Sequence, residues 1–119
     1  MGLLTKQDIL NARDLATEDI DVPEWGGTVR VRTLTGRERD LFEASLTTGE
    51  GKKRKVDLAN IRAKLVAMCI VDETGAREFE DTEIAALGAK SAAALDRVFS
   101  ACQRLNGLSS QDVEELEKN

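Results

Sequence analysis

The sequence predicts a single α+β domain that is predominantly helical, with an N-terminal β-hairpin packed on the helices. The chain has 119 residues, which is the size of one ordinary domain. Polar and apolar residues alternate on both sides of a Pro/Gly-rich connection between residues 18 and 34, as they do in a β-hairpin. Apolar residues then recur at helical spacing over 57–69 and 91–105. We expect the hairpin to pack on these two helices.

A short helix is predicted in the N-terminal segment 1–15. Thr5 is followed by Asp8, so the threonine oxygen can accept a free amide hydrogen while the carboxylate favours the positive end of the helix. We expect this helix to end near Arg13. The first ten residues have neither a basic leader nor an apolar stretch of signal-peptide length, and no window resembles a membrane span. We therefore expect no export by a standard signal and no contact with a membrane.

Two alternating segments, 18–22 and 28–34, form the predicted hairpin. Val29 and Val31 fall on the side that should face the core. The connection carries Trp25, the only tryptophan of the chain. A large indole in such a connection either packs over the hairpin or anchors a partner, and the sequence does not choose between these roles.

The arginines of the second strand have acidic candidates opposite them. Arg30 and Arg32 should face solvent or the acidic first strand. Asp19 and Asp21 are the expected cross-strand partners, and such pairs contribute tenths of a kcal/mol up to roughly 1 kcal/mol. The hairpin should therefore carry ion pairs on its outer side.

A helix is predicted to begin after Thr35. Thr35 and Glu38 have the spacing of a capping box, in which each side chain satisfies the other residue's backbone amide. The helix should run to about Leu46. Leu41, Phe42 and Leu46 are expected to form its buried side.

The segment 47–55 is predicted to be a mobile basic loop. Its sequence, TTGEGKKRK, contains two glycines and no apolar anchor. It ends in the four successive cations Lys52, Lys53, Arg54 and Lys55. Without them the chain has 13 cations against 22 anions, a net charge of -9. The run is either a solvated loop or a contact for an acidic partner or nucleic acid.

The next helix should contain the centre of the core. Asp57 can cap it, and its apolar residues follow helical spacing: Leu58, Ile61, Leu65, Met68 and Cys69. Residues 65–71, LVAMCIV, are wholly apolar. We expect protein to surround this segment.

A turn is expected over 72–75, because its sequence, DETG, is typical of turns. Residues 76–80 are then predicted to return as a short strand that carries Phe79 inward. A short helix should begin at Asp81 or Thr82.

That short helix should end at Gly88, and Ser91 should begin a longer one. Asn106 and Gly107 are expected to end the longer helix, because glycine readily adopts a left-handed conformation. An acidic helix is predicted over 109–119, where few apolar residues leave it prone to fray. The buried stripe of the longer helix should be Leu95, Val98, Phe99, Cys102 and Leu105.

Several chemistries are disfavoured by composition. The chain has no histidine, which removes histidine acid/base pairs, nucleophile–histidine pairs and histidine-containing zinc sites. Neither glycine-rich phosphate-loop spacing occurs. The carboxylate clusters are explained by caps, turns and solvated faces. We therefore expect a protein without catalytic residues, metal or cofactor, and therefore no enzyme.

The charge and the cysteines point to a non-nucleic-acid role in a reducing compartment. The net charge of -5 has the wrong sign for general attraction to phosphate backbones, so nucleic acid is not the expected partner. Cys69 and Cys102 lie in apolar stretches, which favours buried, reduced thiols.

Four runs of the sequence carry a family resemblance, and they are Asp21 to Arg32 (DVPEWGGTVRVR), Leu34 to Asp40 (LTGRERD), Leu65 to Gly75 and Ala89 to Leu108. Through these runs the sequence resembles the tail assembly chaperones of long-tailed bacteriophages and prophages. The resemblance covers about residues 16–108. These motifs are structural rather than chemical.

The resemblance implies a non-enzymatic assembly factor of the infected bacterial cytoplasm. Such a chaperone coats the tape-measure protein, recruits major tail-tube subunits and is absent from the mature virion. A coat of this kind also makes self-association an open expectation. Trp25 and the run Lys52 to Lys55 are the candidate partner-binding residues. The alternative is a virion structural protein, such as a head-tail connector or a tail-completion protein, which would remain in the particle.

Members of this family commonly occur as a short form and a frameshifted longer form. Glu117-Lys118-Asn119 can be encoded by GAA-AAA-AAC, which contains a slippery heptamer. We treat a programmed frameshift as a hypothesis that the nucleotide sequence decides.

Overall fold

The computed structural model describes residues 2–48, 55–56 and 60–107. Three sequence predictions lie outside these residues. They concern the cap at Asp57, the cations Lys52, Lys53 and Arg54, and the acidic helix at 109–119 together with its frameshift codons.

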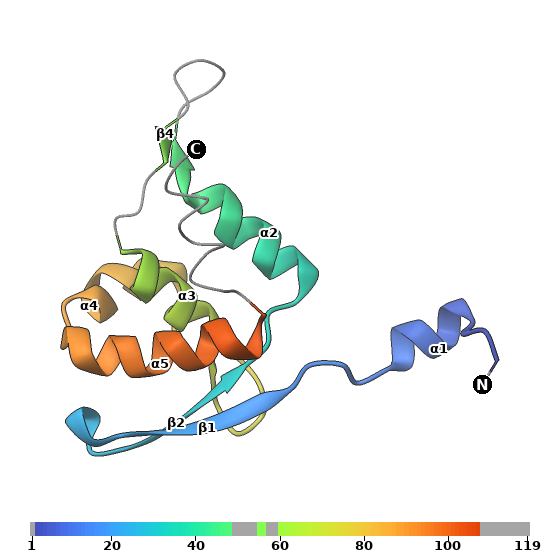
Figure 1. The fold of residues 1–119 in the computed structure, drawn as a ribbon, viewed down its shortest axis with the longest axis horizontal. Helices are drawn as coiled ribbons and strands as arrows, with labels where there is room; N and C mark the ends of the chain where they lie inside the picture. The colour runs from blue at the N-terminus through green and yellow to red at the C-terminus, as the bar shows by residue number, and fades with distance from the viewer. Residues whose placement is uncertain (1, 49–54, 57–59, 108–119) are drawn as a thin grey trace.

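The described elements are five α-helices, two short 3-10 helices and five strands in two sheets (Figure 1). The strands are β1 (Thr17–Val22), β2 (Gly27–Arg32), β3 (Thr47–Thr48), β4 (Lys55–Val56) and β5 (Ile70–Val71). The helices are α1 (Lys6–Asn11), η1 (Pro23–Trp25), α2 (Gly36–Ser45), α3 (Ile61–Cys69), η3 (Asp81–Glu83), α4 (Ile84–Gly88) and α5 (Ala92–Leu105). The α+β class and its helical predominance are confirmed.

The main sheet is antiparallel and has the order β1-β2-β5. All six residues of β1 pair with β2, from Thr17 opposite Arg32 to Val22 opposite Gly27. In contrast, only Arg30 and Val31 of β2 pair with β5. One edge of β2 is therefore open over its first half within the described residues.

The core lies where α3, α5 and the sheet meet. The predicted central segment 65–71 is buried throughout, from the end of α3 through β5. Val22 and Val31 of the hairpin belong to the same buried cluster as Val98 of α5. Two ion pairs join the hairpin to α5, Arg97 to Glu24 at 3.0 Å and Arg104 to Glu18 at 2.6 Å. The hairpin thus lies along α5 (Figure 1).

The predicted caps are present. In both Thr5/Asp8 and Thr35/Glu38 the two reciprocal bonds of a capping box are formed. The Ser91 hydroxyl accepts a hydrogen bond from the amide of Ala94 at the start of α5. Local hydrogen bonds that need only neighbouring residues were therefore predictable.

The turn prediction and the helix ends predicted at Gly88 and Gly107 are also confirmed. Asp72 Oδ1 accepts from the Thr74 amide and hydroxyl, and Gly75 takes φ +88° to close the turn. Gly107 takes φ +68° after α5. Gly88 ends α4 as expected. In the N-terminal segment, α1 ends at Asn11 rather than near Arg13.

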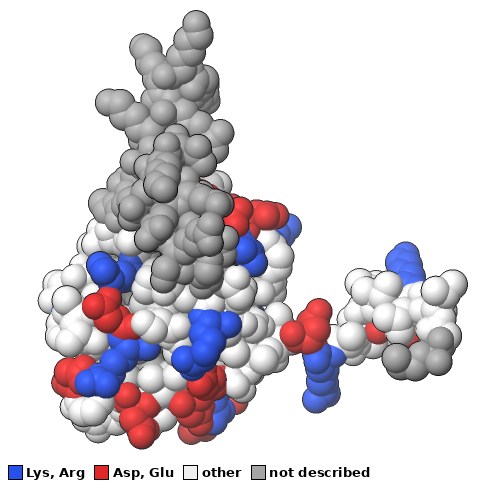
Figure 2. All heavy atoms as spheres, in the orientation of Figure 1, with Lys and Arg blue, Asp and Glu red and all other residues white. Residues whose placement is uncertain are grey.

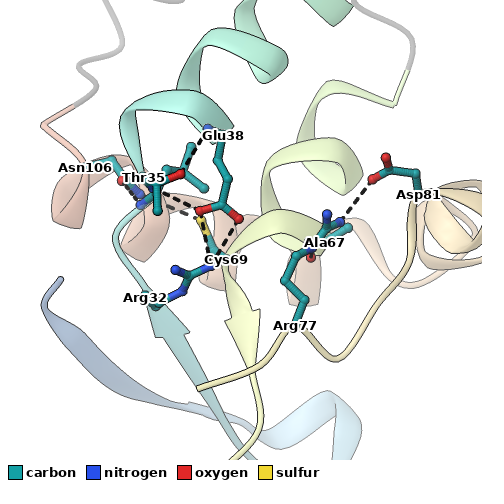
Figure 3. Close-up of polar contacts among 9 residues, drawn as sticks. Arg32, Thr35, Glu38, Ala67, Cys69, Arg77, Asp81 and Asn106 are labelled. Atoms are coloured by element: carbon teal, nitrogen blue, oxygen red, sulfur yellow. Dashed lines mark hydrogen bonds and ion pairs between the residues drawn. The ribbon is translucent and has the colours of Figure 1, made fainter. Parts of the chain in front are cut away.

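Asn106 contributes to a polar junction that the sequence did not predict (Figure 3). Its Oδ1 accepts from the Leu34 amide at 2.6 Å, and its Nδ2 donates to the Cys102 carbonyl at 2.8 Å. Beside it, Arg32 donates to Glu38, the carboxylate that also caps α2. This junction fastens the end of the hairpin to the end of α5.

Two predictions about the hairpin's outer side are wrong. Arg32 faces neither solvent nor β1, because it is covered and pairs with Glu38 at 3.1 Å. Asp21 accepts a hydrogen bond from the Thr28 hydroxyl at 2.8 Å and pairs with neither Arg30 nor Arg32. Arg30 does pair with Asp19, at 2.7 Å, as expected. Of the two valines, Val31 is buried and Val29 is half-buried against the core.

Leu41 was predicted to be buried, and this is wrong. It is 59% exposed, whereas Phe42 and Leu46 are buried as expected. Phe42 of α2 and the C-cap residue Leu46 are four residues apart and lie on one side of the helix, and Leu41 projects about a third of a turn away from that side.

Three predicted element boundaries are corrected. The helix predicted from Asp57 begins at Ile61, after Asn60 with φ +59°. The strand predicted at 76–80 is reduced to one bridge between Val71 and Arg77, although Phe79 does pack partly against the core. The ends of the predicted loop 47–55 pair with each other as β3 and β4.

Candidate partner-binding groove and N-terminal arm

A groove of about 780 Å³ opens beside the free edge of β2. It forms because β5 contains only two residues, after which the chain turns away at Asp72 and leaves the first half of β2 uncovered. We call it the β2 groove. Its lining residues are Asp19, Trp25, Thr28, Val29, Arg30, Ile70, Val71, Asp72, Glu73, Thr74, Glu78 and Phe79.

The apolar part of the β2 groove comes from separate parts of the chain. Trp25 is contributed by η1, Val29 by β2, and Phe79 by the segment that follows the turn. These three side chains are half-buried and pack against the core. Because the rings of Trp25 and Phe79 each pack against the core on one side, their other sides are presented to the groove in fixed positions.

The rim of the β2 groove is acidic. Four carboxylates, those of Asp19, Asp72, Glu73 and Glu78, line it together with one guanidinium, that of Arg30, which gives a net formal charge of -3. The hydrogen bond from Arg30 holds the pKa of Asp19 below its ordinary value. The same pair, with Glu73 nearby, raises the pKa of Arg30. The Asp19 carboxylate is therefore ionised at neutral pH.

The turn beside the groove is held by its own acidic residue. The Asp72 carboxylate accepts hydrogen bonds from the Thr74 hydroxyl and from backbone amides, and these bonds lower the pKa of Asp72. Glu73 and Glu78 are exposed, and neither forms an ion pair within the described residues. An apolar floor with a free acidic rim suits an apolar segment that also carries a cation.

A second unpartnered apolar surface is the N-terminal arm, which we define as residues 2–15. Its helix α1 buries no residue. Within the described residues the large exposed apolar side chains are those of the arm together with Leu41. Figure 1 shows α1 apart from the rest of the fold, and Figure 2 shows the arm as a separate, largely uncharged body. The exposed arm residues are Leu3, Leu4, Ile9, Leu10 and Leu15.

The cysteines are placed for packing rather than for chemistry. Cys69 and Cys102 are both free and buried. A hydrogen bond between the two thiols and burial raise the pKa of Cys102, which keeps it protonated. Among the described residues no group of three or more histidine, cysteine, aspartate or glutamate side chains is arranged to hold a metal ion.

The structure describes only some of the predicted partner-binding residues. Trp25 lines the β2 groove. Lys52, Lys53 and Arg54 lie outside the described residues, and Lys55 is described only as a backbone residue of β4 paired with Thr48. Their role stays a prediction.

Sequence reasoning missed two features of these surfaces. Phe79 was predicted to point inward, and its part in the groove depends on packing between distant segments. The exposure of the arm could have been predicted from one observation: a six-residue helix with few apolar residues has little apolar surface to pack against a core.

Comparison with known proteins places the chain in a family. The model of the family described as phage tail assembly chaperone matches residues 6–119. The chain belongs to this family. The resemblance found in the sequence is thereby confirmed. Neither the comparison with curated proteins nor that with solved structures found a match.

The match includes α1, so the arm helix is part of the region shared by phage tail assembly chaperones. In the part of this chaperone that the structure describes, no helix is both long and apolar enough to span a bilayer. Its partners are phage tail proteins in general. Among the described residues, its unpartnered apolar surfaces are the β2 groove and the N-terminal arm.

Proposed function

We propose that this chaperone binds the tape-measure protein, keeps it soluble and recruits major tail-tube subunits while the tail is built. It acts in the cytoplasm of the bacterial host, without catalysis, and leaves before the virion is complete. Family membership supports the general role. The observation that carries the specific proposal is the β2 groove with Trp25, Val29 and Phe79.

The partner's chemistry explains why such a groove is useful. A tape-measure protein is a long helical chain with apolar stripes, which invite aggregation until the tube surrounds them. A helix can lay an apolar face into an apolar groove, with side chains three and four residues apart as anchors. The rings of Trp25 and Phe79 are suited to receive such anchors.

Release requires that each contact be weak. The β2 groove is open and presents few apolar side chains, so one copy covers only a short length of helix. Many copies along one tape-measure protein hold it together by multivalency, while each copy remains exchangeable for a tube subunit. We propose that the basic run Lys52 to Lys55 recruits the tube protein by binding an acidic surface on it.

Coexpression with the tape-measure protein of the same genome tests the proposal. We expect the chaperone to raise the soluble fraction of that protein, and Trp25→Ala to lower this gain several-fold. Leu41→Ala is the matched control, because it removes an exposed apolar side chain outside the groove. Thermal unfolding of both variants checks that the fold is retained. An unchanged soluble fraction with the wild-type chain would overturn the proposal.

A second measurement separates this function from the structural alternative. We expect mass spectrometry of purified mature tails to find no copies of the chain. Stoichiometric copies in finished tails would instead identify a head-tail connector or tail-completion protein.

A further inference from the structure

We propose that the free edge of β2 binds an extended segment of a partner protein in which one basic residue stands between two apolar residues. The segment adds to the sheet as a short antiparallel strand beside Thr28. This ligand differs from the tape-measure helix of the proposed function, because backbone hydrogen bonds hold it as well as side chains. Binding at this edge needs no cargo, so it can be tested on the chaperone alone.

The β2 groove follows the edge of the strand rather than one of its faces. Neighbouring side chains of a strand point to opposite faces of the sheet. Val29 lies on the face that packs against the core, whereas Thr28 and Arg30 lie on the opposite, exposed face. All three residues nevertheless line the groove. A groove that is reached from both faces of one strand is open at the edge of that strand, where an added strand would lie.

The backbone of Thr28 points into this opening. Successive residues of a paired strand direct their N–H and C=O groups to opposite edges. Thr33 donates to the Ala16 carbonyl on the β1 side. The alternation therefore turns the backbone groups of Arg30 and Thr28 toward the other edge. Arg30 is opposite Val71, where β5 ends, so the amide and the carbonyl of Thr28 form no hydrogen bond among the described residues.

The opening has space for a second backbone. After β5 the chain turns back on itself, and the Asp72 amide donates to the Ala76 carbonyl, so the turn does not continue β5 alongside Thr28. A Cβ added to Gly27 would meet no atom within 4 Å. The groove measures about 780 Å³ at this point. An extended segment therefore fits at the ordinary spacing of neighbouring strands.

The exposed face selects a basic side chain. A residue paired with Thr28 directs its own side chain to the face that Thr28 and Arg30 share. On this face Arg30 is already paired with Asp19. That hydrogen bond and, less strongly, the charge of Glu73 raise the pKa of Arg30, which places the Glu73 carboxylate on the same side. Glu73 forms no ion pair within the described residues, so a lysine or arginine of the segment complements it.

The core-side face selects apolar side chains. The residues before and after the basic residue point to the other face of the sheet. There they meet Trp25, Val29 and Phe79, which are half-buried and pack against the core. The pattern that fits the edge is therefore apolar, basic, apolar in an extended backbone.

Binding should be weak, because one residue pair provides only two backbone hydrogen bonds. The segment and a tape-measure helix would meet the same apolar side chains, so the two ligands exclude each other. Strand addition would then release a helix from the groove. This consequence rests on the proposed function, whereas binding of the segment itself does not.

A capped peptide of sequence Gly-Val-Lys-Val-Gly tests the inference on the full-length purified chain. The peptide is too short to form a helix, and valine favours an extended backbone. In an NMR titration of the isotope-labelled chaperone the amide resonance of Thr28 should shift. The fluorescence of Trp25, the only tryptophan, should change over the same range. We expect a dissociation constant on the order of a millimolar.

Matched peptides and variants separate the backbone from the charges. Methylation of the lysine amide removes a backbone donor and keeps every side chain, so the affinity should fall roughly tenfold. Replacing this lysine with glutamate should also weaken binding. Glu73→Gln should weaken binding of the lysine peptide roughly two- to fivefold. Asp40→Asn is the control, because Asp40 is an exposed carboxylate of α2 outside the groove, and it should bind like the wild type.

Three outcomes would overturn the inference. The first is a Thr28 resonance that does not move at about 10 mM peptide, well above the expected dissociation constant. The second is equal affinity for the methylated and unmethylated peptides. The third is a Thr28 resonance that moves with chaperone concentration alone, which would identify a second copy as the occupant. Coexpression with the tape-measure protein reports on the proposed function separately, so the two failures are distinguishable.

Discussion

Helices α1 and α5 begin with similar caps but differ in burial. Each begins with a hydroxyl cap, Thr5 for α1 and Ser91 for α5, and each carries apolar side chains. Helix α1 buries none of its residues. In α5 the buried residues are Ala94, Leu95, Val98, Ala101 and Cys102. Caps and periodicity thus determine where a helix forms, whereas burial depends on the surface available to pack against it.

The same contrast holds for the polar contacts. Arg97 and Arg104 of α5 form ion pairs with the hairpin, and Asn106 bonds to the Leu34 amide just after α5 ends. At the base of the arm, the hydrogen bonds to the body among the described residues join Ala16 and Thr33. Helix α5 is therefore part of the packed fold, whereas α1 adds no buried residue to it.

Matched leucine substitutions should show the largest difference between the two helices. Leu95 is 5% exposed, so Leu95→Ala should lower the free energy of unfolding by about 2–5 kcal/mol. The same change at Leu10 should stay within about 0.5 kcal/mol, because it removes no buried contact. Urea denaturation of both variants measures this difference. A comparable loss at Leu10 would show that the arm is part of the fold.

The two capping boxes give a finer comparison. Thr35→Ala should cost about 1 kcal/mol in the free energy of unfolding, because the Glu38 amide loses its acceptor at the start of α2. Thr5→Ala removes the equivalent bond to Asp8, yet it should leave global unfolding unchanged. NMR chemical shifts should instead show loss of helix over α1 alone. Equal effects of the two changes on denaturation would contradict this separation.

Lowering the pH should produce the smallest difference between α1 and the body of the fold. Hydrogen bonds from Thr74 and Thr5 lower the pKa values of Asp72 and Asp8 from an ordinary 3.8. Each carboxylate contributes stability that is fully present above 3.8 and is lost as the pH falls through its lowered folded-state pKa. For Asp72 the loss should reduce global stability, whereas for Asp8 it should affect only α1. Denaturation between pH 5 and about 2.5, repeated with Asp72→Asn and Asp8→Asn, checks that stability falls with pH and which of the two carboxylates affects global unfolding.

Features that depend on neighbours in the sequence were predictable. The caps at Thr5, Thr35 and Ser91 were found correctly, as was the turn at Asp72. The wholly apolar run 65–71 was also identified as the centre of the core. In each case the responsible atoms lie within a few residues of one another, or the side chains leave no alternative to burial.

The wrong predictions concern which partner a side chain meets. Arg32 could pair with the hairpin or with α2, and only the packed fold places Glu38 beside it. Leu41 is next to Phe42 in the sequence, and the orientation of α2 in the packed fold determines which of the two side chains is buried. For the groove, Trp25 was singled out, but Phe79, which also lines it, comes from a distant segment that follows β5 and its turn.

The sequence by itself determined where most helices and turns begin and end, and that the chain offers no histidine chemistry. Only the tertiary structure decided that α5 is covered while the arm is not, and that a short β5 leaves a groove at the edge of β2. The physical reason is range. Caps and turns are satisfied by atoms a few residues apart, whereas burial and grooves are properties of surfaces assembled from segments distant in the chain.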